Sequence, residues 1–469
     1  MGQQTRGDDL AGVGPPGDAW VRVRREMSDV AGQTPEQVQR WWLSRASALL
    51  RHHARWSLNV AYRELIEDAG VDPVSAIQTD GAWTRVPVID KQWLAGAGYD
   101  RRPACSGPVL VVATSGSTAT QVLVPVTAEC ANRGLGDNFL RALAMSGVGP
   151  DQRHWGIEHR PAGHRQSQGQ GETGSSVSMT WLARHCGDHA LVTAATEPLD
   201  EQVRRAAAFG PDTISGSPGF LGQIARAGAA LRPMLLVYGG AVLAGTDAAL
   251  LRARFPEARL TAFYPTTDAG ALGAAPARDG VYRTFTETHL IEVLDDEGRP
   301  VAAGSRGDVV VTQFDAWAAP IIRYRVGDRA TYRGWDQGRL LLSDIERAAE
   351  AAIGSTLVPY SDLRTWTPRL AARDPSVLAV QLVRGYAPGQ QREQPIVRVI
   401  GRADGAGLTA AARSLLDDFP QIVAEIASGE LAPALVEFRD PPATLAGHWK
   451  IPLYVDERTT PEGTPCPSE

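Results

Sequence analysis

Short apolar runs alternate with amphipathic segments through the middle of this chain, and this alternation constrains the fold more than any other feature. The apolar runs are 109–113, 213–216, 234–238 and 259–264, and the amphipathic segments beside the later ones are 202–209, 220–230 and 246–255. Strands that alternate with helices are typical of α/β domains. We therefore expect an α/β fold whose large N-terminal domain is built on mainly parallel sheets.

Each apolar run ends in small, hydroxyl-bearing or glycine residues. The four ends read TSGST (114–118), SGSP (215–218), YGGA (238–241) and YPTTD (264–268). Ligands of open α/β sheets bind at the carboxyl ends of the strands, although strand-to-helix turns favour the same residue types without a ligand. The TSGST loop combines hydroxyl and backbone N–H groups, which suit phosphate oxygens. An ordinary serine- and glycine-rich turn is the alternative interpretation.

The flanking sequence predicts helices before this region and a different architecture after it. Apolar residues recur at helical spacing over 20–75 and 128–145, and alternating runs at 308–312 and 321–326 indicate a β-rich subdomain. A small, mobile α+β domain is expected to follow, with helices at 343–353 and 408–426, the second with a break at Pro420, and strands at 377–383 and 396–400. The predicted organisation is a disordered tail (1–19), an N-terminal domain (20–338), a C-terminal domain (339–458) and a second disordered tail (459–469).

A polar tract at 154–178 interrupts the α/β pattern. Its GQGETG at 169–174 matches the spelling GxGxxG, but no apolar strand precedes it, which argues against a dinucleotide site. His154, His159 and His164 are five residues apart, a spacing that does not place metal ligands on one helix face. We interpret the tract as a loop that is solvated or faces a substrate.

Charge and cysteine content exclude several classes of protein. A formal net charge of −6 argues against a nucleic-acid partner, which requires a basic surface. No apolar run reaches the roughly 18 residues of a membrane span, and four scattered cysteines fit a reducing, cytoplasmic location. Of 47 basic residues only Lys91 and Lys450 are lysine. A chain that uses arginine almost everywhere can keep lysine where a compact ammonium is needed. Chance is the alternative interpretation.

Seven segments carry a family resemblance when they are taken in order. They are AYRELIEDAGVDP, VPVIDK, TSGSTATQVLVPVT, LLVYGGA, FYPTTDAG, PIIRYRVGD and AGHWKIPLYVDER. Their order and distances over roughly 55–458 resemble those of the adenylate-forming enzymes, in particular the phenylacetate–CoA ligase-like branch. The resemblance implies that ATP and Mg²⁺ activate a carboxylic acid.

By this resemblance, ATP and AMP contact residues in four of the segments. They are Thr114, Ser115, Gly116, Ser117, Thr118, Gly239, Gly240, Ala241, Phe263, Tyr264, Pro265, Thr266, Thr267, Arg325 and Asp328. The loop hydroxyls hold the β- and γ-phosphates, Tyr264 stacks on adenine, and Asp328 accepts both ribose hydroxyls. Arg325, or Arg323 in its place, adds positive charge.

The resemblance also implies catalytic, metal-binding and substrate residues. Thr267, Thr118 and Lys450 are the implied catalytic residues, with Thr267 and Lys450 at the α-phosphate, and Asp268 is the implied magnesium ligand. The implied substrate pocket contains Trp155, His159, Ser217, Gly239 and Thr266.

The chain departs from the family pattern at several positions. Ala119 stands where glycine is usual, and its Cβ disfavours a positive φ; Thr120 and Gln121 stand near where proline or lysine is usual. Asp268 is one methylene shorter than the usual glutamate, so its contact with Mg²⁺ lengthens or passes through water. Ala241 replaces a frequent glutamate, and the hinge segment is reduced to GRLLLSD (338–344). These differences weaken the expectation that the acyl group is transferred to an acceptor thiol, the second half-reaction, more than the expectation that the chain binds a nucleotide.

Three functions are compatible with these observations. The first is activation of a small, aromatic carboxylic acid as its acyl-adenylate, followed by transfer to the thiol of coenzyme A. The second is a biosynthetic adenylating enzyme with another acceptor or acid: an amine, a carrier-protein thiol, or nitrite-type N–N chemistry. The third is an inactive nucleotide-binding homologue, which Ala119 and Asp268 favour and which Lys450 and Asp328 oppose.

Overall fold

The computed structural model describes residues 17–55, 60–73, 80–96, 109–113, 123–158, 174–194, 197–228, 230–241, 243, 245–276, 279–347, 350–388, 390, 392–401, 405–440 and 453–457. They form two compact units that divide between Ile345 and Glu346, apart from the short segment 244–246. The predicted domain boundary at 338/339 falls at the first residue of strand β13 (Arg339–Arg347), and the units divide within that strand. The predicted tail at 459–469 lies outside the described residues.

Helices form the N-terminal part of the first unit, as expected for 20–75. They are α1 (Asp18–Ala31), α2 (Pro35–Arg55) and α3 (Val60–Asp68), followed by the short α4 (Asp80–Trp83) and α5 (Lys91–Ala95). Helix α1 begins inside the segment 1–19, for which the sequence predicts a disordered tail. Among the described helices, none combines the length and the apolar composition that crossing a membrane requires.

One mixed sheet of eleven strands organises the first unit, in the order β10-β11-β12-β13-β9-β8-β7-β6-β5-β3-β4. Besides β13, the strands are β3 (His154–Glu158), β4 (Ala190–Ala194), β5 (Thr213–Gly216), β6 (Leu235–Gly239), β7 (Arg259–Thr266), β8 (Gly270–Ala275), β9 (Tyr282–Thr284), β10 (His289–Leu294), β11 (Arg306–Gln313) and β12 (Tyr324–Asp336). Strands β4, β3, β5, β6 and β7 pair in parallel, whereas β7–β8, β8–β9, β9–β13, β12–β11 and β11–β10 are antiparallel.

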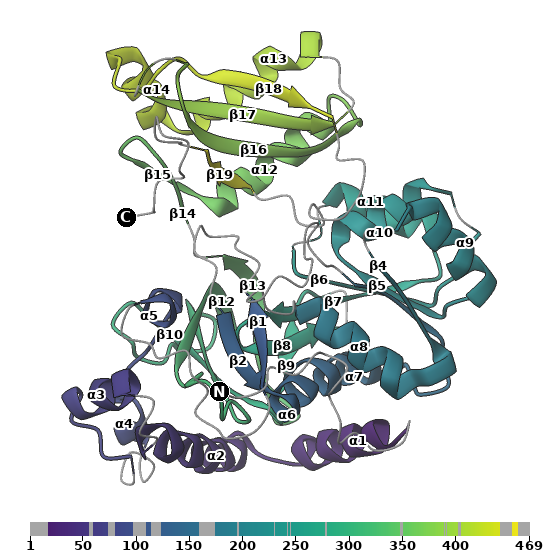
Figure 1. Ribbon diagram of the computed structural model, residues 1–469, viewed down its shortest axis with the longest axis vertical. Helices are drawn as coiled ribbons and strands as arrows, with labels where there is room; N and C mark the ends of the chain where they lie inside the picture. The colour runs from purple at the N-terminus through teal and green to yellow at the C-terminus, as the bar shows by residue number, and fades with distance from the viewer. Residues whose placement is uncertain are drawn as a thin grey trace. The chain divides into compact units, whose positions relative to one another are not determined.

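The α/β class is therefore confirmed, but the expectation of mainly parallel sheets is wrong. The β-rich region forms no separate subdomain, because its strands continue the parallel half as one sheet. Figure 1 shows helices on both faces of the parallel half, with α7 (Asn138–Met145) and α8 (Gly174–Cys186) on one face and α10 (Pro218–Arg226) and α11 (Gly245–Arg254) on the other. Helix α9 (Leu199–Phe209) joins β4 to β5. The predicted helices at 202–209, 220–230 and 246–255 are confirmed within a few residues.

The structure corrects the interpretation of 154–178 as a loop. The tract begins as β3, which pairs with both β4 and β5, and α8 begins at Gly174. Residues 159–173, including His159 and His164, lie outside the described residues. A strand that is buried on both faces carries no alternating pattern of apolar and polar residues. In addition, β3 begins with the polar His154, so the apolar Trp155 and Ile157 after it did not stand out as a strand.

Two short strands enclose the TSGST loop. Strands β1 (Val109–Ala113) and β2 (Leu123–Thr127) pair antiparallel, and 114–122, with the loop itself, lies outside the described residues. The helix predicted for 128–145 is confirmed as α6 (Ala128–Ala131), a π-helical turn (Asn132–Asp137) and α7.

The second unit contains a four-stranded sheet in the order β18-β17-β16-β19. Its elements are β14 (Glu350–Ile353), β15 (Thr356–Pro359), α12 (Tyr360–Ala371), β16 (Val377–Tyr386), β17 (Glu393–Gly401), α13 (Gly405–Arg413), α14 (Pro420–Ser428), β18 (Leu435–Arg439) and β19 (Tyr454–Asp456). Trp366 of α12 and Leu408 of α13 share a core with Val380 and Val397 of the sheet. The α+β character is confirmed, and the predicted helix at 408–426 is interrupted before Pro420, where α14 begins.

The prediction of a helix at 343–353 is wrong. These residues belong to β13 and to the hairpin of β14 and β15. Ala351 and Ile353, two residues apart in β14, are both buried, as expected for one face of a strand. Alanine and glutamate favour a helix locally, but antiparallel pairing with β15 holds Glu350–Ile353 as a strand.

Candidate functional site

The carboxyl ends of β6 and β7 place the predicted nucleotide residues next to one another. Gly239, the last residue of β6, pairs with Phe263 of β7. A Cβ on Gly239 would lie 3.0 Å from the carbonyl oxygen of Phe263 and 3.3 Å from Cδ of Pro265, so a larger residue would separate the two strands. Gly240 has a φ of 76°, a conformation that favours glycine, and Ala241 after it is exposed.

Tyr264 and Asp328 form the first of two polar links between β7 and β12. The Tyr264 hydroxyl donates a hydrogen bond of 2.8 Å to Oδ2 of Asp328, and both side chains are buried. The Tyr264 ring meets the Tyr282 ring edge-on, with centroids 6.0 Å apart. Burial raises the pKa of Tyr282 and of Tyr238 on β6, so both phenols stay neutral at physiological pH. The residues predicted to bind adenine and ribose thus lie together beside an aromatic group.

Tyr324 and Asp268 form the second link, in the opposite direction. Here the donor, Tyr324, lies on β12, and its hydroxyl donates to Oδ2 of Asp268 in the turn after β7. Tyr324 and Asp328 both lie on β12 and both are buried, and the two links join them to the turn after β7 and to β7 itself. The sequence analysis missed Tyr324, although it lies inside the PIIRYRVGD segment, because only the pairing of strands shows that its hydroxyl reaches Asp268.

Thr266 closes the turn that carries Thr267 and Asp268. Its hydroxyl donates to the carbonyl of Gly270 (2.9 Å) and accepts from the amide of Ala269 (3.2 Å). Gly270 has a φ of 76°, and a Cβ there would lie 2.9 Å from the carbonyl oxygen of Gly134. Thr267 and Asp268 are half-buried at the tip of this closed turn.

The predicted cationic residues are held by carboxylates. Arg325 forms an ion pair with Asp308 at 3.1 Å. Arg323 is buried, pairs with Glu292 at 3.1 Å and donates to the carbonyl of Val86. The alternative that Arg323 supplies charge to a nucleotide is therefore disfavoured, because its guanidinium holds β12 to β10 and to the segment before α5.

Two predicted pocket residues have structural contacts of their own. Trp155 is fully buried, donates from Nε1 to Thr193 at 3.0 Å and packs edge-on against Phe220. Ser217 is the N-cap of α10, where its hydroxyl accepts from the amide of Phe220. Their place in a substrate pocket stays a prediction, as does that of His159, which lies outside the described residues.

The remaining catalytic predictions also fall outside the described residues. They concern Lys450 and the loop residues Thr114, Ser115, Gly116, Ser117 and Thr118. Within the described ranges no three histidine, cysteine or carboxylate side chains are grouped to hold a metal. Asp268 alone nevertheless suits Mg²⁺, which often takes one or two protein carboxylates and completes its shell with phosphates and water.

Solved structures of other proteins have a similar fold, although the sequence comparisons found no match. No protein-family model matches the sequence, and no curated protein matches it. Among solved structures, 2-hydroxyisobutyryl-CoA ligase in complex with 2-HIB-AMP is similar with a TM-score of 0.63 at 17% identity, covering 96% of this chain and 94% of the other. The GH3.15 acyl acid amido synthetase has a TM-score of 0.61 at 13% identity, covering 96% of each chain. This chain has the fold of the adenylate-forming enzymes.

The adenylate-forming fold accounts for the geometry described above without fixing the chemistry. One similar structure is named a CoA ligase and the other an amido synthetase. Both likenesses extend over nearly the whole chain, so they concern both compact units. At these identities the likeness shows the fold alone.

Proposed function

We propose that this protein activates a carboxylic acid with ATP, forming an acyl-adenylate and pyrophosphate. The observation that carries the proposal is the reciprocal pair of links Tyr264–Asp328 and Tyr324–Asp268 at the carboxyl ends of the parallel strands. Adenylation needs the carboxylate of the acid aligned with the α-phosphate while pyrophosphate leaves, which depends on positioning and charge stabilisation. Two cross-linked strands supply a rigid frame for that purpose.

Each described residue has a role in this proposal. Asp328 accepts the ribose hydroxyls, while its bond from Tyr264 fixes its orientation. The aromatic group of Tyr264 and Tyr282 adjoins the adenine. Thr267 donates its hydroxyl to the α-phosphate from the tip of the closed turn.

Asp268 holds Mg²⁺, which when bound neutralises phosphate charge. Because aspartate is short, its carboxylate must be well directed, and the Tyr324 hydroxyl directs it. Lys450 places its ammonium between the acid and the α-phosphate, and the loop 114–118 holds the β- and γ-phosphates. These last roles rest on the sequence resemblance.

The acid in this proposal is small and aromatic, and the acceptor is the thiol of coenzyme A. A second candidate keeps the adenylation and changes the acceptor to an amine or a carrier-protein thiol, or the acid to a nitrite-type substrate. The likeness to an amido synthetase over 96% of the chain favours keeping this alternative. An inactive nucleotide-binding homologue is the third. Of the two residues that favour it, Ala119 lies outside the described residues, and Asp268 accepts a hydrogen bond from Tyr324.

The test is pyrophosphate release with ATP and Mg²⁺ across a panel of aryl, amino-aryl and short polar acids, with and without coenzyme A. Lys450→Ala is the diagnostic variant, and Lys91→Ala is its matched control because these are the only two lysines. The proposal expects acid-dependent release that Lys91→Ala retains and Lys450→Ala loses. A thioester product identifies coenzyme A as the acceptor. No release with any acid, while ATP still binds, contradicts the proposal and favours the inactive homologue.

A further inference from the structure

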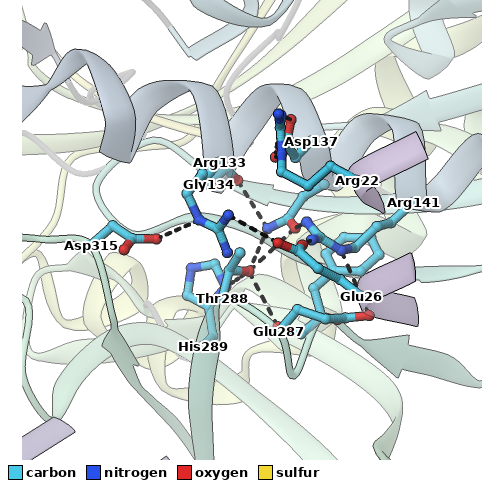
Figure 2. A network of polar contacts seen from close by, with 12 residues as sticks. Arg22, Glu26, Arg133, Gly134, Asp137, Arg141, Glu287, Thr288, His289 and Asp315 are labelled. Atoms are coloured by element: carbon cyan, nitrogen blue, oxygen red, sulfur yellow. Dashed lines mark hydrogen bonds and ion pairs between the residues drawn. The ribbon is translucent and has the colours of Figure 1, made fainter. Parts of the chain in front are cut away.

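A buried network of charged and polar side chains lies behind the turn that carries Thr267 and Asp268. Figure 2 shows this network, which joins α1, the π-helical turn, α7 and the segment before β10. Its outer part consists of ion pairs and its inner part of a file of hydrogen bonds with side branches to backbone carbonyls. The inner file ends on a backbone carbonyl of the turn. Packing alone does not explain why these buried polar side chains are joined to that carbonyl.

The outer part fixes Arg141 of α7 in place. The guanidinium of Arg141 is fully buried, donates to Glu26 of α1 and lies 3.6 Å from Glu287. Burial raises the pKa of Glu287, but Arg339 and Arg141 beside it lower that pKa further, so the net shift is downward and Glu287 is ionised at neutral pH. Glu26 also pairs with Arg133 at 3.1 Å. Arg141 therefore has carboxylates on two sides and cannot turn away from the inner file.

The inner file runs from Arg141 to the turn through three side chains. Arg141 donates to Oδ1 of Asn138 at 2.6 Å, and Nδ2 of Asn138 donates to the Thr288 hydroxyl at 2.9 Å. The Thr288 hydroxyl lies 2.8 Å from Nδ1 of His289. Nε2 of His289 lies 2.7 Å from the carbonyl oxygen of Ala269, the residue after Asp268.

The carbonyl oxygen of Ala269 at the end of the file determines which ring nitrogen of His289 carries the hydrogen, and so the direction of the hydrogen bonds on either side of that ring. A carbonyl oxygen only accepts, so Nε2 of His289 carries the hydrogen. Burial lowers the pKa of His289 to about 4, so at neutral pH Nδ1 carries none and accepts from Thr288. Asn138 Nδ2 also donates to the carbonyls of Gly134 (3.1 Å) and Ala271 (2.8 Å), and the Thr288 hydroxyl also lies 3.2 Å from Oδ1 of Asn138 and 3.3 Å from the carbonyl oxygen of Phe285. The last two bonds still have one direction, from Thr288 through His289 to the carbonyl of Ala269, which makes this end of the file a directional support for the turn.

We infer that Thr288 and His289 are positioning residues that hold the Ala269 carbonyl and thereby fix the turn presenting Thr267 and Asp268. Thr266 closes the turn from within, through its own hydroxyl. His289 holds the same turn from behind, through a side chain that belongs to another strand. The catalytic consequence rests on the proposed function, because a turn that shifts by about 1 Å misaligns groups at the α-phosphate and can cost a hundredfold in rate.

The experiment compares paired substitutions in the full-length protein. His289→Leu removes the donor to Ala269, whereas His289→Gln keeps a side-chain N–H at a similar reach. Thr288→Val removes the hydroxyl of the file, whereas Thr288→Ser keeps it. Thr261→Val is the matched control, because Thr261 is a buried threonine of β7 whose hydroxyl bonds to Ser146 at 2.8 Å, away from the turn.

Two readouts are measured on each variant. The first is amide hydrogen exchange of peptides covering 264–270, which needs no substrate. We expect exchange about tenfold faster in His289→Leu and Thr288→Val, and wild-type exchange in His289→Gln, Thr288→Ser and Thr261→Val. The second is adenylation kinetics, in which kcat falls tenfold to a hundredfold in the first two variants while KM for ATP stays within twofold.

The two readouts separate this inference from the proposed function. Unchanged exchange in the turn of Thr288→Val overturns the inference, and so does equal acceleration in Thr261→Val, which would indicate general loosening of the core. Should wild-type protein adenylate no acid, the proposed function fails while the exchange result still decides whether Thr288 and His289 hold the turn. If His289→Leu does not fold, the isosteric Thr288→Val carries the test.

Discussion

At the scale of single residues, the site depends on two tyrosine–aspartate links that point in opposite directions. Tyr264 donates from β7 to β12, and Tyr324 donates from β12 to the turn after β7. The sequence predicted Tyr264, Asp268 and Asp328 as site residues through their motifs. It did not predict which hydroxyl meets which carboxylate, because that depends on strand register across 64 and 56 residues of chain.

Asp328→Asn tests the role of the first link. The amide oxygen of asparagine still accepts from Tyr264, so the fold is kept, but asparagine cannot accept two ribose hydroxyls as a carboxylate does. We expect KM for ATP to rise about tenfold, equivalent to ~1.4 kcal/mol, with little change in Tm. Steady-state adenylation and a thermal melt measure the two quantities, with Asp295→Asn on an exposed turn as control. An unchanged KM would remove Asp328 from the ribose site.

Tyr324→Phe tests the second link. Phenylalanine keeps the packing of this buried ring but removes the donor to Asp268. We expect the Mg²⁺ concentration for half-maximal adenylation to rise severalfold, because the carboxylate loses its orientation. The loss of one hydrogen bond to a charged group should lower the free energy of unfolding by about 1.5–3 kcal/mol. A Mg²⁺ dependence identical to that of wild type would show that Asp268 needs no orientation by Tyr324.

At the scale of elements, the sequence predicted the parallel half of the sheet and its helices well. Those segments have strong periodicity and end in recognisable turn residues, as at Ser217, which caps α10. It failed at β3, whose two buried faces leave no alternation, and at 343–353, where the pairing of β14 with β15 overrides a local preference for helix. Strand pairing determined the conformation in both places: β3 pairs with strands that are distant in the sequence, whereas β14 pairs with the adjacent β15.

The ion pairs around Glu287 join α7 to β13, so we expect them to contribute to the free energy of unfolding. Glu287→Gln leaves the buried guanidinium of Arg339 without its carboxylate and leaves Arg141 with Glu26 alone. Removing one partner of a buried ion pair typically costs about 3–5 kcal/mol, whereas an exposed pair is worth less than about 1 kcal/mol. Denaturant unfolding should show that difference between Glu287→Gln and Arg226→Gln, whose pair with Asp247 is exposed. Equal effects would contradict the role of the network in stability.

At the scale of the whole molecule, buried histidines link stability to pH. Burial lowers the pKa of His53 to about 3, and that of His154 and His289 to about 4. Between these values and the ordinary pKa near 6.5, the unfolded chain binds more protons than the folded one. The stability contributed by neutral histidines is therefore complete above pH 6.5 and is lost as pH falls towards 4.

Denaturant unfolding at pH 7 and pH 5 checks this linkage. Each of the three histidines should lower the free energy of unfolding by about 2 kcal/mol over that interval. In His289→Gln the contribution of one histidine is absent, so the pH dependence should be shallower by about that amount. A free energy of unfolding that is constant between the two pH values would contradict the neutral state of these histidines.

If an acid attacks the α-phosphate of ATP, one oxygen of its carboxylate passes to AMP, and isotope transfer detects that step. An acid that supports pyrophosphate release is labelled with ¹⁸O in its carboxylate and turned over with ATP, Mg²⁺ and hydroxylamine as a general acceptor. Attack at the α-phosphate predicts AMP carrying one ¹⁸O atom from the acid, detected by mass spectrometry. Label in orthophosphate together with ADP would show attack at the γ-phosphate instead, and AMP without label would show hydrolysis of ATP without an acyl-adenylate. Either result would contradict the account.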